Sequence, residues 1–170
     1  MDLAAVGYTP GEPVLRRLNL RIDPEDRIAL LGRNGNGKTT LARLLARQME
    51  PMEGSLSYSP KIRIGYFTQY QVEELPAGST PLQLMTRAMV DKPELAVRTQ
   101  LGRFGFSGDR AIAEAFTLSG GERARLALAL VTRDAPHLLI LDEPTNHLDV
   151  DACEALVQAL NAFAGAVILV

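Results

Sequence analysis

A glycine-rich segment with one lysine and one threonine has the most specific chemistry in this sequence. It runs Gly32-Arg33-Asn34-Gly35-Asn36-Gly37-Lys38-Thr39, and Thr40 follows it. Glycines let consecutive backbone N–H groups turn toward a polyphosphate, and the helix that follows directs its positive end at the same anion. In such a loop Lys38 bridges the terminal phosphates and the Thr39 hydroxyl ligates Mg²⁺. The pattern therefore predicts a phosphate-binding loop rather than a turn with an incidental lysine.

Two adjacent carboxylates, Asp142 and Glu143, end a second informative segment. The aliphatic residues 138–141 precede them, as expected of a strand buried on both faces. The carboxyl end of a parallel strand faces the crevice where ligands bind in such sheets. We expect Asp142 to bind Mg²⁺ through water and Glu143 to polarise an attacking water. The alternative is a pair of solvated acids in the turn before Pro144.

A serine and two glycines lie between these segments, in Leu118-Ser119-Gly120-Gly121-Glu122. Taken alone, Ser119 is an N-cap before an amphipathic helix. The free N–H groups of a helix N-terminus also attract anions, so this step is a second candidate site for a phosphate. Gln69, at the end of another expected strand, is a weaker candidate for Mg²⁺, because a glutamine at a strand end is usually a surface residue.

The elements that must position these residues alternate between short aliphatic runs and helical stretches. This alternation predicts an α/β fold, a mostly parallel sheet covered by helices. Strands are expected at 14–22, 28–31, 62–66, 138–141 and 166–170, and helices at 38–50, 120–133 and 151–163.

Residues 71–117 have a different character. Thr80-Pro81-Leu82-Gln83 has the form of a capping box with proline in the first turn, so a helix should begin there. Pro93 opens a second helical stretch, and glycines interrupt the region near its end. We interpret the segment as a small helical subdomain inserted into the sheet domain.

Composition and length narrow the class of protein. A chain of 170 residues is expected to form one domain. No apolar stretch reaches the roughly 18 residues of a membrane helix, and residues 1–10 lack the features of a signal peptide. Cys153 is the single cysteine, so a reducing compartment, the cytoplasm, is expected. The net charge of −2 gives no general attraction to nucleic acid.

The ordered motifs resemble the ABC-F family of ATPases, most closely the second nucleotide-binding domain of its bacterial members. The segments that carry the resemblance are Gly32–Thr40, Gly65–Gln69, Leu118–Leu130 and Leu141–Asp149. Asn146 and His147 are particularly characteristic, because transporter ATPases usually carry other residues at these two positions. The similarity extends from Tyr8 to Val170.

The resemblance implies a P-loop NTPase fold of ABC type, with a small antiparallel β part and the helical subdomain at about 71–117. It implies ATP and Mg²⁺ as cofactors, with residues 32–40 binding nucleotide and Tyr8 stacking on adenine. Thr39, Gln69 and Asp142 would hold Mg²⁺, and Glu143 would be catalytic. Residues 119–122 would contact ATP held by a partner, and Asp149 would lie at the dimer interface.

The implied partners are a second ABC domain, in the same chain or as a homodimer, and the ribosome with its RNA, without membrane insertion. The family's switch histidine would follow shortly after Val170. Residues 1–170 are therefore expected to be one C-terminally truncated domain that binds ATP with little turnover. Two other functions stay open: the ATPase subunit of a membrane transporter, and a largely non-catalytic nucleotide-binding scaffold.

Overall fold

The computed structural model describes residues 1–76, 78–146, 148, 150–161 and 163–170, with the backbone alone at residues 69, 73, 151, 152 and 155. The chain forms two compact units. The first contains residues 1–66, 136–142 and 164–170, and the second contains residues 67–135 and 143–163. Each unit has a hydrophobic cluster of its own.

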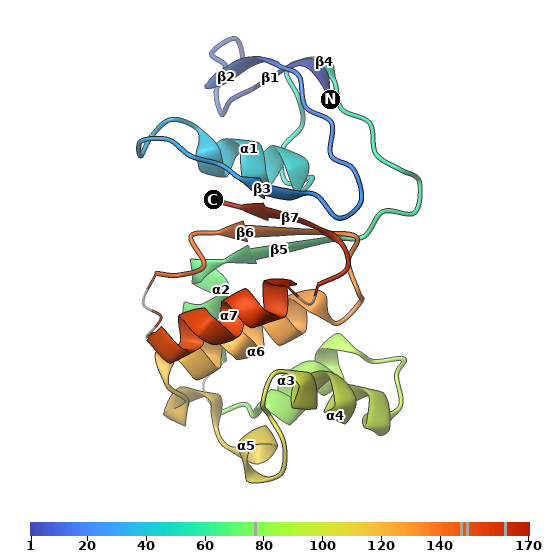
Figure 1. The fold of residues 1–170 in the computed structure, drawn as a ribbon, viewed down its shortest axis with the longest axis vertical. Helices are drawn as coiled ribbons and strands as arrows, with labels where there is room; N and C mark the ends of the chain where they lie inside the picture. Colours follow the sequence, from blue (N-terminus) through green and yellow to red (C-terminus); the bar gives the residue numbers. More distant parts are fainter. Residues whose placement is uncertain (77, 147, 149, 162) are drawn as a thin grey trace. The chain divides into compact units, whose positions relative to one another are not determined.

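The strands form two sheets, which lie almost entirely in the first unit. The antiparallel sheet has the order β2-β1-β4, made of β1 (Asp2–Val6), β2 (Leu15–Leu18) and β4 (Glu53–Ser55). The larger sheet has the order β3-β7-β6-β5, made of β3 (Arg27–Ala29), β7 (Ala166–Leu169), β6 (Leu138–Asp142) and β5 (Ile64–Thr68), as Figure 1 shows. Strand β7 pairs in parallel with both β3 and β6. The predicted sheet with a small antiparallel part is confirmed.

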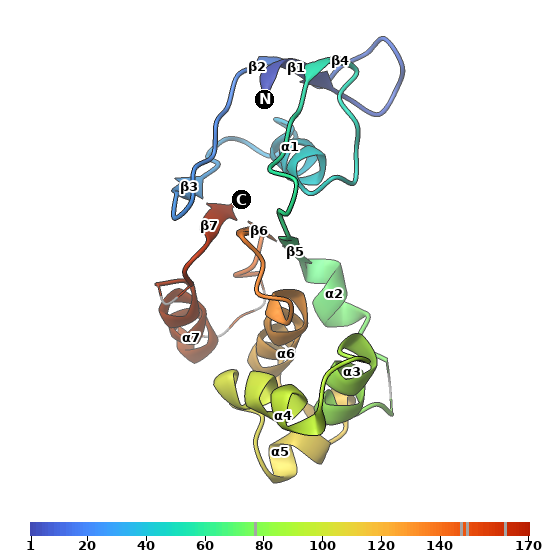
Figure 2. The ribbon, with the colours of Figure 1, turned by 90° about the vertical axis from the view of Figure 1, so that its right-hand side faces the viewer.

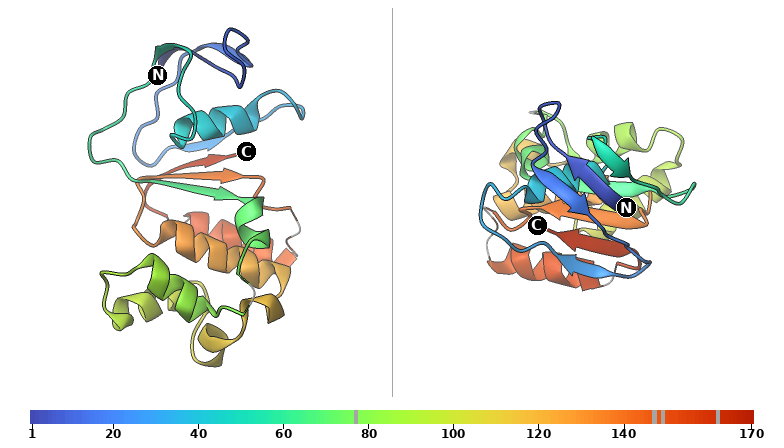
Figure 3. Two further views of the ribbon diagram at one scale, coloured as in Figure 1. Left: turned by 180° about the vertical axis from the view of Figure 1, so that it is seen from behind. Right: turned by 90° about the horizontal axis from the view of Figure 1, so that it is seen from above.

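Helix α1 (Lys38–Leu45) supplies the core of the first unit. Its Ala42 and Leu45 pack against Leu138 and Ile140, which share one face of β6 because strand side chains alternate. Ala166 and Ile168 of β7 complete the cluster. Figures 2 and 3 show α1 lying along these strands, with the antiparallel sheet on its other side. The phosphate-loop candidate is therefore attached to a packed helix.

Helix α1 ends earlier than the sequence pattern predicts. Apolar periodicity continues to residue 50, but the helix stops at Leu45. Arg47 adopts a left-handed φ of 61°, and the N–H of Gln48 donates to the carbonyl of Arg43 at 2.9 Å. This six-to-one bond is the Schellman ending, which usually has glycine at the left-handed position.

Tyr58 explains why an arginine can occupy that position. The Arg47 guanidinium lies 4.1 Å from the centre of the Tyr58 ring. The Tyr58 hydroxyl donates to the carbonyls of Leu44 and Leu45 at 3.0 and 3.2 Å, and so satisfies the last turn of the helix. A tertiary contact therefore ends the helix.

Two predicted strands are also shorter than expected. Strand β2 covers Leu15–Leu18 instead of 14–22. The run at 28–31 was expected to be buried, but β3 ends at Ala29 and Leu31 is 91% exposed. The physical reason is that β3 is an edge strand in the described sheet, paired only with β7.

The second unit is helical. Its elements are α2 (Gln69–Glu73), α3 (Pro81–Ala88), α4 (Glu94–Arg103), α5 (Asp109–Ile112), the 3₁₀ turn η1 (Ala115–Thr117), α6 (Gly120–Thr132) and α7 (Val150–Asn161). The capping box predicted at Thr80 is present, because its hydroxyl accepts from the N–H of Gln83 while the Gln83 side chain accepts from the N–H of Thr80. The predicted inserted segment at 71–117 lies within this unit.

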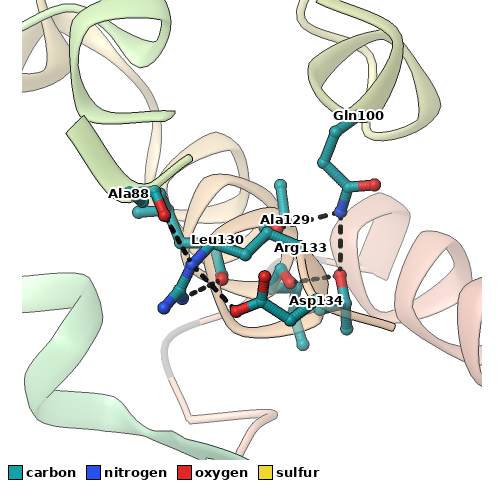
Figure 4. A network of polar contacts seen from close by, with 8 residues as sticks. Ala88, Gln100, Ala129, Leu130, Arg133 and Asp134 are labelled. Atoms are coloured by element: carbon teal, nitrogen blue, oxygen red, sulfur yellow. Dashed lines mark hydrogen bonds and ion pairs between the residues drawn. The ribbon is translucent and has the colours of Figure 1, made fainter. Parts of the chain in front are cut away.

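Polar contacts fasten the small helices to α6 (Figure 4). The buried Gln100 of α4 donates to the carbonyl of Ala129 at 3.0 Å and to the Thr132 hydroxyl at 3.2 Å. Arg133, just after α6, donates to the carbonyl of Ala88 at 3.1 Å. Helices α3 and α4 are therefore hydrogen-bonded to α6 and the residue after it, and α6 begins at the serine–glycine step.

Candidate functional site

The glycine-rich loop closes around its own lysine. Gly35 and Gly37 have left-handed φ angles of 82° and 80°, which a side chain would strain. The Lys38 ammonium donates to the carbonyls of Gly32 and Arg33 at 2.9 and 3.2 Å. The loop thus holds a cation next to the N-terminus of α1, and both features attract a polyphosphate.

Asp142 and Thr39 come together within the first unit, as the sequence predicts. Asp142 ends β6 and is 7% exposed. The Thr39 hydroxyl donates to Asp142 Oδ1 at 3.2 Å, so the lone pairs of the hydroxyl stay available for a cation. A hydroxyl and one carboxylate suit Mg²⁺, which keeps several waters and takes other ligands from substrate phosphates. The described residues contain no cluster of three or more His, Cys, Asp or Glu.

Tyr66 is a member of this site that the sequence reasoning treated only as a strand residue. Its hydroxyl donates to Asp142 Oδ2 at 3.1 Å. Burial, followed by the nearby Asp142 carboxylate, raises the pKa of Tyr66 to about 12. No local pattern singles out this role, because it depends on β5 lying next to β6, which is distant in sequence.

Arg43 of α1 was also missed. Burial lowers the pKa of its guanidinium, but contacts with the hydroxyls of Tyr66 and Tyr8 outweigh this effect and the pKa is raised. Arg43 therefore lies near both tyrosine hydroxyls, on the same helix that carries Thr39.

Tyr8, the predicted adenine-stacking residue, follows β1. Its side chain is 59% exposed. Its hydroxyl lies 3.3 Å from Thr40 Oγ1, a hydrogen-bond distance at which either oxygen can donate. The hydroxyl is tied to the start of α1 while much of the ring stays open to solvent, an arrangement that suits a stacking platform.

In the second unit, Ser119 caps α6 through a complete capping box. Its Oγ accepts from the N–H of Glu122 at 3.2 Å, and Glu122 Oε2 accepts from the N–H of Ser119 at 2.9 Å. Since Oγ serves as the acceptor, the serine proton is free to donate to an anion. Gly120 is exposed, whereas Gly121 is buried.

Arg110 of α5 completes this cap. Its guanidinium lies 3.1 Å from Glu122 Oε1. The pKa of Glu122 is lowered, chiefly because the Ser119 N–H donates to its carboxylate, with the Arg110 charge acting in the same direction. The ion pair connects the small helices to the predicted signature.

Glu143 has an unusual backbone for its residue type. Its φ is 50°, a left-handed value that is uncommon outside glycine. The side chain is exposed, and the Asn146 amide donates to Glu143 Oε2 at 2.7 Å. Asn146 thus orients the carboxylate predicted to be catalytic.

Three predicted residues have only partial or no description. Gln69 is the first residue of α2 and directly follows β5, as expected, but its side chain lies outside the described residues. Asp149 and His147 also lie outside them. Their predicted roles stay predictions.

Residues 15–146 match the family model described as ABC transporter. The chain belongs to the ABC transporter family. The predicted ABC-type ATPase fold is thereby confirmed. None of the helices among the described residues is long and apolar enough to cross a membrane.

Curated relatives of this ABC domain include F-family members. It is 45% identical over 170 residues to "Probable ATP-binding protein YheS" of Escherichia coli K12, covering 100% of this chain and 26% of that protein. It is 43% identical over 167 residues to "ABC transporter F family member 3" of Arabidopsis thaliana, covering 98% and 23%. It is 43% identical over 163 residues to "ATP-binding cassette sub-family F member 3" of Homo sapiens, covering 96% and 23%. The chain spans about a quarter of the length of these relatives.

Solved structures support the fold. An ABC transporter described as metal-chelate type, in an inward-facing conformation, superposes with a TM-score of 0.82 at 23% identity, covering 99% of this chain and 70% of that one. A bacterial ABC transporter cassette solved as a dimer gives a TM-score of 0.78 at 20% identity, covering 99% and 85%.

Proposed function

We propose that this ABC domain binds ATP with Mg²⁺ and hydrolyses it in a pair with a second ABC domain. The arrangement of Lys38, Thr39 and Asp142 within the first unit carries the proposal. A cation and a hydroxyl lie at the start of α1, and a buried carboxylate lies at the end of β6. A nucleoside triphosphate with its metal requires these groups.

Each group has a separate task in binding. The backbone of residues 32–37 and the Lys38 ammonium hold the phosphates, Thr39 and Asp142 hold the metal, and Tyr8 stacks on the base. Bound Mg²⁺ neutralises charge on the transferred phosphoryl group. When ATP enters, Lys38 must exchange its two carbonyl partners for phosphate oxygens.

The remaining residues activate the attacking water or contact the second ABC domain. Glu143, held by Asn146, accepts a proton from the attacking water. Ser119, Gly120, Gly121 and Glu122 present the start of α6 to ATP bound by the second domain. Gln69 adds to the metal site, and Asp149 communicates across the pair.

The F-family relatives support a finer proposal: the ABC pair is an ATP-gated switch that engages the ribosome in the cytoplasm. Asn146 and His147, in the segment that resembles F-family members, favour this function over that of a transporter ATPase subunit.

Equilibrium ATP binding tests the proposal directly. Lys38→Ala is expected to weaken ATP binding about 10- to 100-fold, because a hydrogen bond to a charged group contributes about 1.5–3 kcal/mol. Isothermal titration of the 170-residue chain measures it. Lys61→Ala is the matched control, since Lys61 is exposed and lies outside the loop. Equal affinity of Lys38→Ala and wild type would contradict the proposed site.

A further inference from the structure

Both oxygens of the Asp142 carboxylate are held, by donors from different elements. Thr39 of α1 donates to Oδ1 at 3.2 Å, and Tyr66 of β5 donates to Oδ2 at 3.1 Å. The Tyr66 ring packs against the core cluster of the first unit, which fixes where its hydroxyl lies. The Asp142 carboxylate is therefore hydrogen-bonded to both helix α1 and the neighbouring strand β5.

The second donor matters because a carboxylate rotates easily about its last bond. The χ2 torsion of aspartate has a broad energy profile, so one hydrogen bond leaves the plane of the carboxylate loosely defined. The Thr39 bond cannot define that plane alone, since the Thr39 oxygen is itself expected to contact the metal. Tyr66 supplies the independent constraint.

Arg43 lies on α1, the helix that also carries Thr39. It follows Thr39 by four residues, so the two side chains leave the same face of the helix one turn apart. Thr39 donates to Asp142 directly, whereas the Arg43 guanidinium lies near the Tyr66 hydroxyl that donates to Asp142. Thr39, Asp142, Tyr66 and Arg43 thus form a circuit that begins and ends on α1 and passes through β6 and β5.

We propose that Tyr66, supported by Arg43, is a positioning residue that sets the orientation of the Asp142 carboxylate for Mg²⁺. The inference rests on the proposed role of Asp142 in metal binding. Tyr66 touches neither phosphate nor base in this scheme. Its loss should therefore weaken the metal-dependent part of nucleotide binding and leave the metal-independent part unchanged.

Tyr66→Phe in the 170-residue chain tests the inference by keeping the ring and removing the hydroxyl. Mn²⁺ serves as the probe, and isothermal titration with the Mn²⁺–ATP complex, compared with titration of ATP in EDTA, reports how much the metal contributes to binding. We expect about 10-fold weaker Mn²⁺ binding, the lower end of the loss seen when a group that orients a metal ligand is removed. ATP affinity in EDTA should change less than about twofold. A general loss of structure would instead weaken ATP binding in EDTA as well.

Tyr58→Phe is the matched control. It also removes a part-buried tyrosine hydroxyl from the first unit, but that hydroxyl donates to the carbonyls of Leu44 and Leu45 at the far end of α1. Its Mn²⁺ affinity should equal that of the wild type. Equal Mn²⁺ affinity of Tyr66→Phe and wild type would overturn the inference.

A second variant covers the case in which Tyr66→Phe does not fold. Arg43→Gln keeps the Tyr66 hydroxyl but removes the cation beside it, so Mn²⁺ binding should weaken in the same direction while ATP binding in EDTA stays constant. No change in Mn²⁺ binding would reject the circuit. Failure of the wild-type chain to bind ATP at all would instead reject the proposed function.

Discussion

Gly35 and Gly37 share a left-handed backbone but differ in their surroundings. A Cβ built on Gly37 would lie 3.0 Å from carbons of Leu15 and Val14, whereas one built on Gly35 meets nothing within 4 Å among the described residues. The phosphate loop therefore rests against β2 at its second left-handed glycine and is open at its first.

The pair Gly35→Ala and Gly37→Ala separates backbone strain from crowding. Gly35→Ala should lower the free energy of unfolding by about 1–2 kcal/mol, the cost of a left-handed residue with a side chain. Gly37→Ala should cost about 1–3 kcal/mol more, because the methyl group also crowds two packed side chains. Urea denaturation of both variants measures this difference. An equal decrease in the free energy of unfolding for both variants would show that the Leu15 side chain moves aside at no cost.

At the residue scale, the sequence predicts residues whose role depends on spacing along the chain. Lys38 and Thr39 follow from the loop pattern, and Asp142 from its place after an aliphatic run. Tyr66 could not be predicted in its observed role, because that role depends on β5 lying next to β6. Sheet neighbours that are distant in sequence have no local signal.

Helix α6 shows how an element can depend on the protonation of one side chain. The Ser119 N–H and Arg110 both stabilise the charged form of Glu122, so the pKa of Glu122 is lowered from 4.5. A lowered pKa means that the carboxylate contributes stability above pH 4.5 and loses it as the pH falls through its value in the folded chain.

Glu122→Gln should therefore be less stable than the wild type at pH 7, and this difference should shrink as the pH falls below 4.5. Thermal unfolding followed by circular dichroism between pH 7 and pH 3.5 measures it. Glu12→Gln, at an exposed acid in another part of the chain, controls for the general effect of removing a carboxylate. A constant difference between Glu122→Gln and wild type at all pH values would contradict the prediction.

The ends of the helices also differ in how far the sequence predicts them, depending on whether local or tertiary contacts set the boundary. The start of α3 was predictable because Thr80 and Gln83 cap it through contacts three residues apart. The end of α1 was not, because Tyr58 and Arg47 end it through a contact across the first unit. Sequence patterns thus locate the starts of these helices better than an ending that depends on packing.

At the scale of the whole molecule, the proposed switch requires two ABC domains that close on ATP. Replacing the Glu143 carboxylate with an amide, which cannot accept the proton of the attacking water, should trap the closed pair. The natural gene product with Glu143→Gln should therefore co-sediment with ribosomes in ATP but not in ADP. Adding Ser119→Arg should abolish this, because a large side chain at the start of α6 would block the partner's ATP.

Sucrose-cushion sedimentation followed by immunoblotting measures this outcome. Equal recovery with ATP and ADP, or no recovery with either, would count against the ribosomal proposal. Co-purification with a membrane protein would instead favour the transporter alternative. Retained sedimentation of the double variant would show that ribosome binding does not need the predicted signature.

The strand order β3-β7-β6-β5 also constrains how the chain can reach its fold. Strand β7 follows β3, β5 and β6 along the chain, yet it forms the ladder between β3 and β6 in the described sheet. An emerging chain exposes the edges of both strands until residues 166–169 arrive. Such distant pairing slows folding and favours aggregation of unfinished chains. The parallel core should therefore assemble late, and chaperone dependence during synthesis is the expected biological consequence.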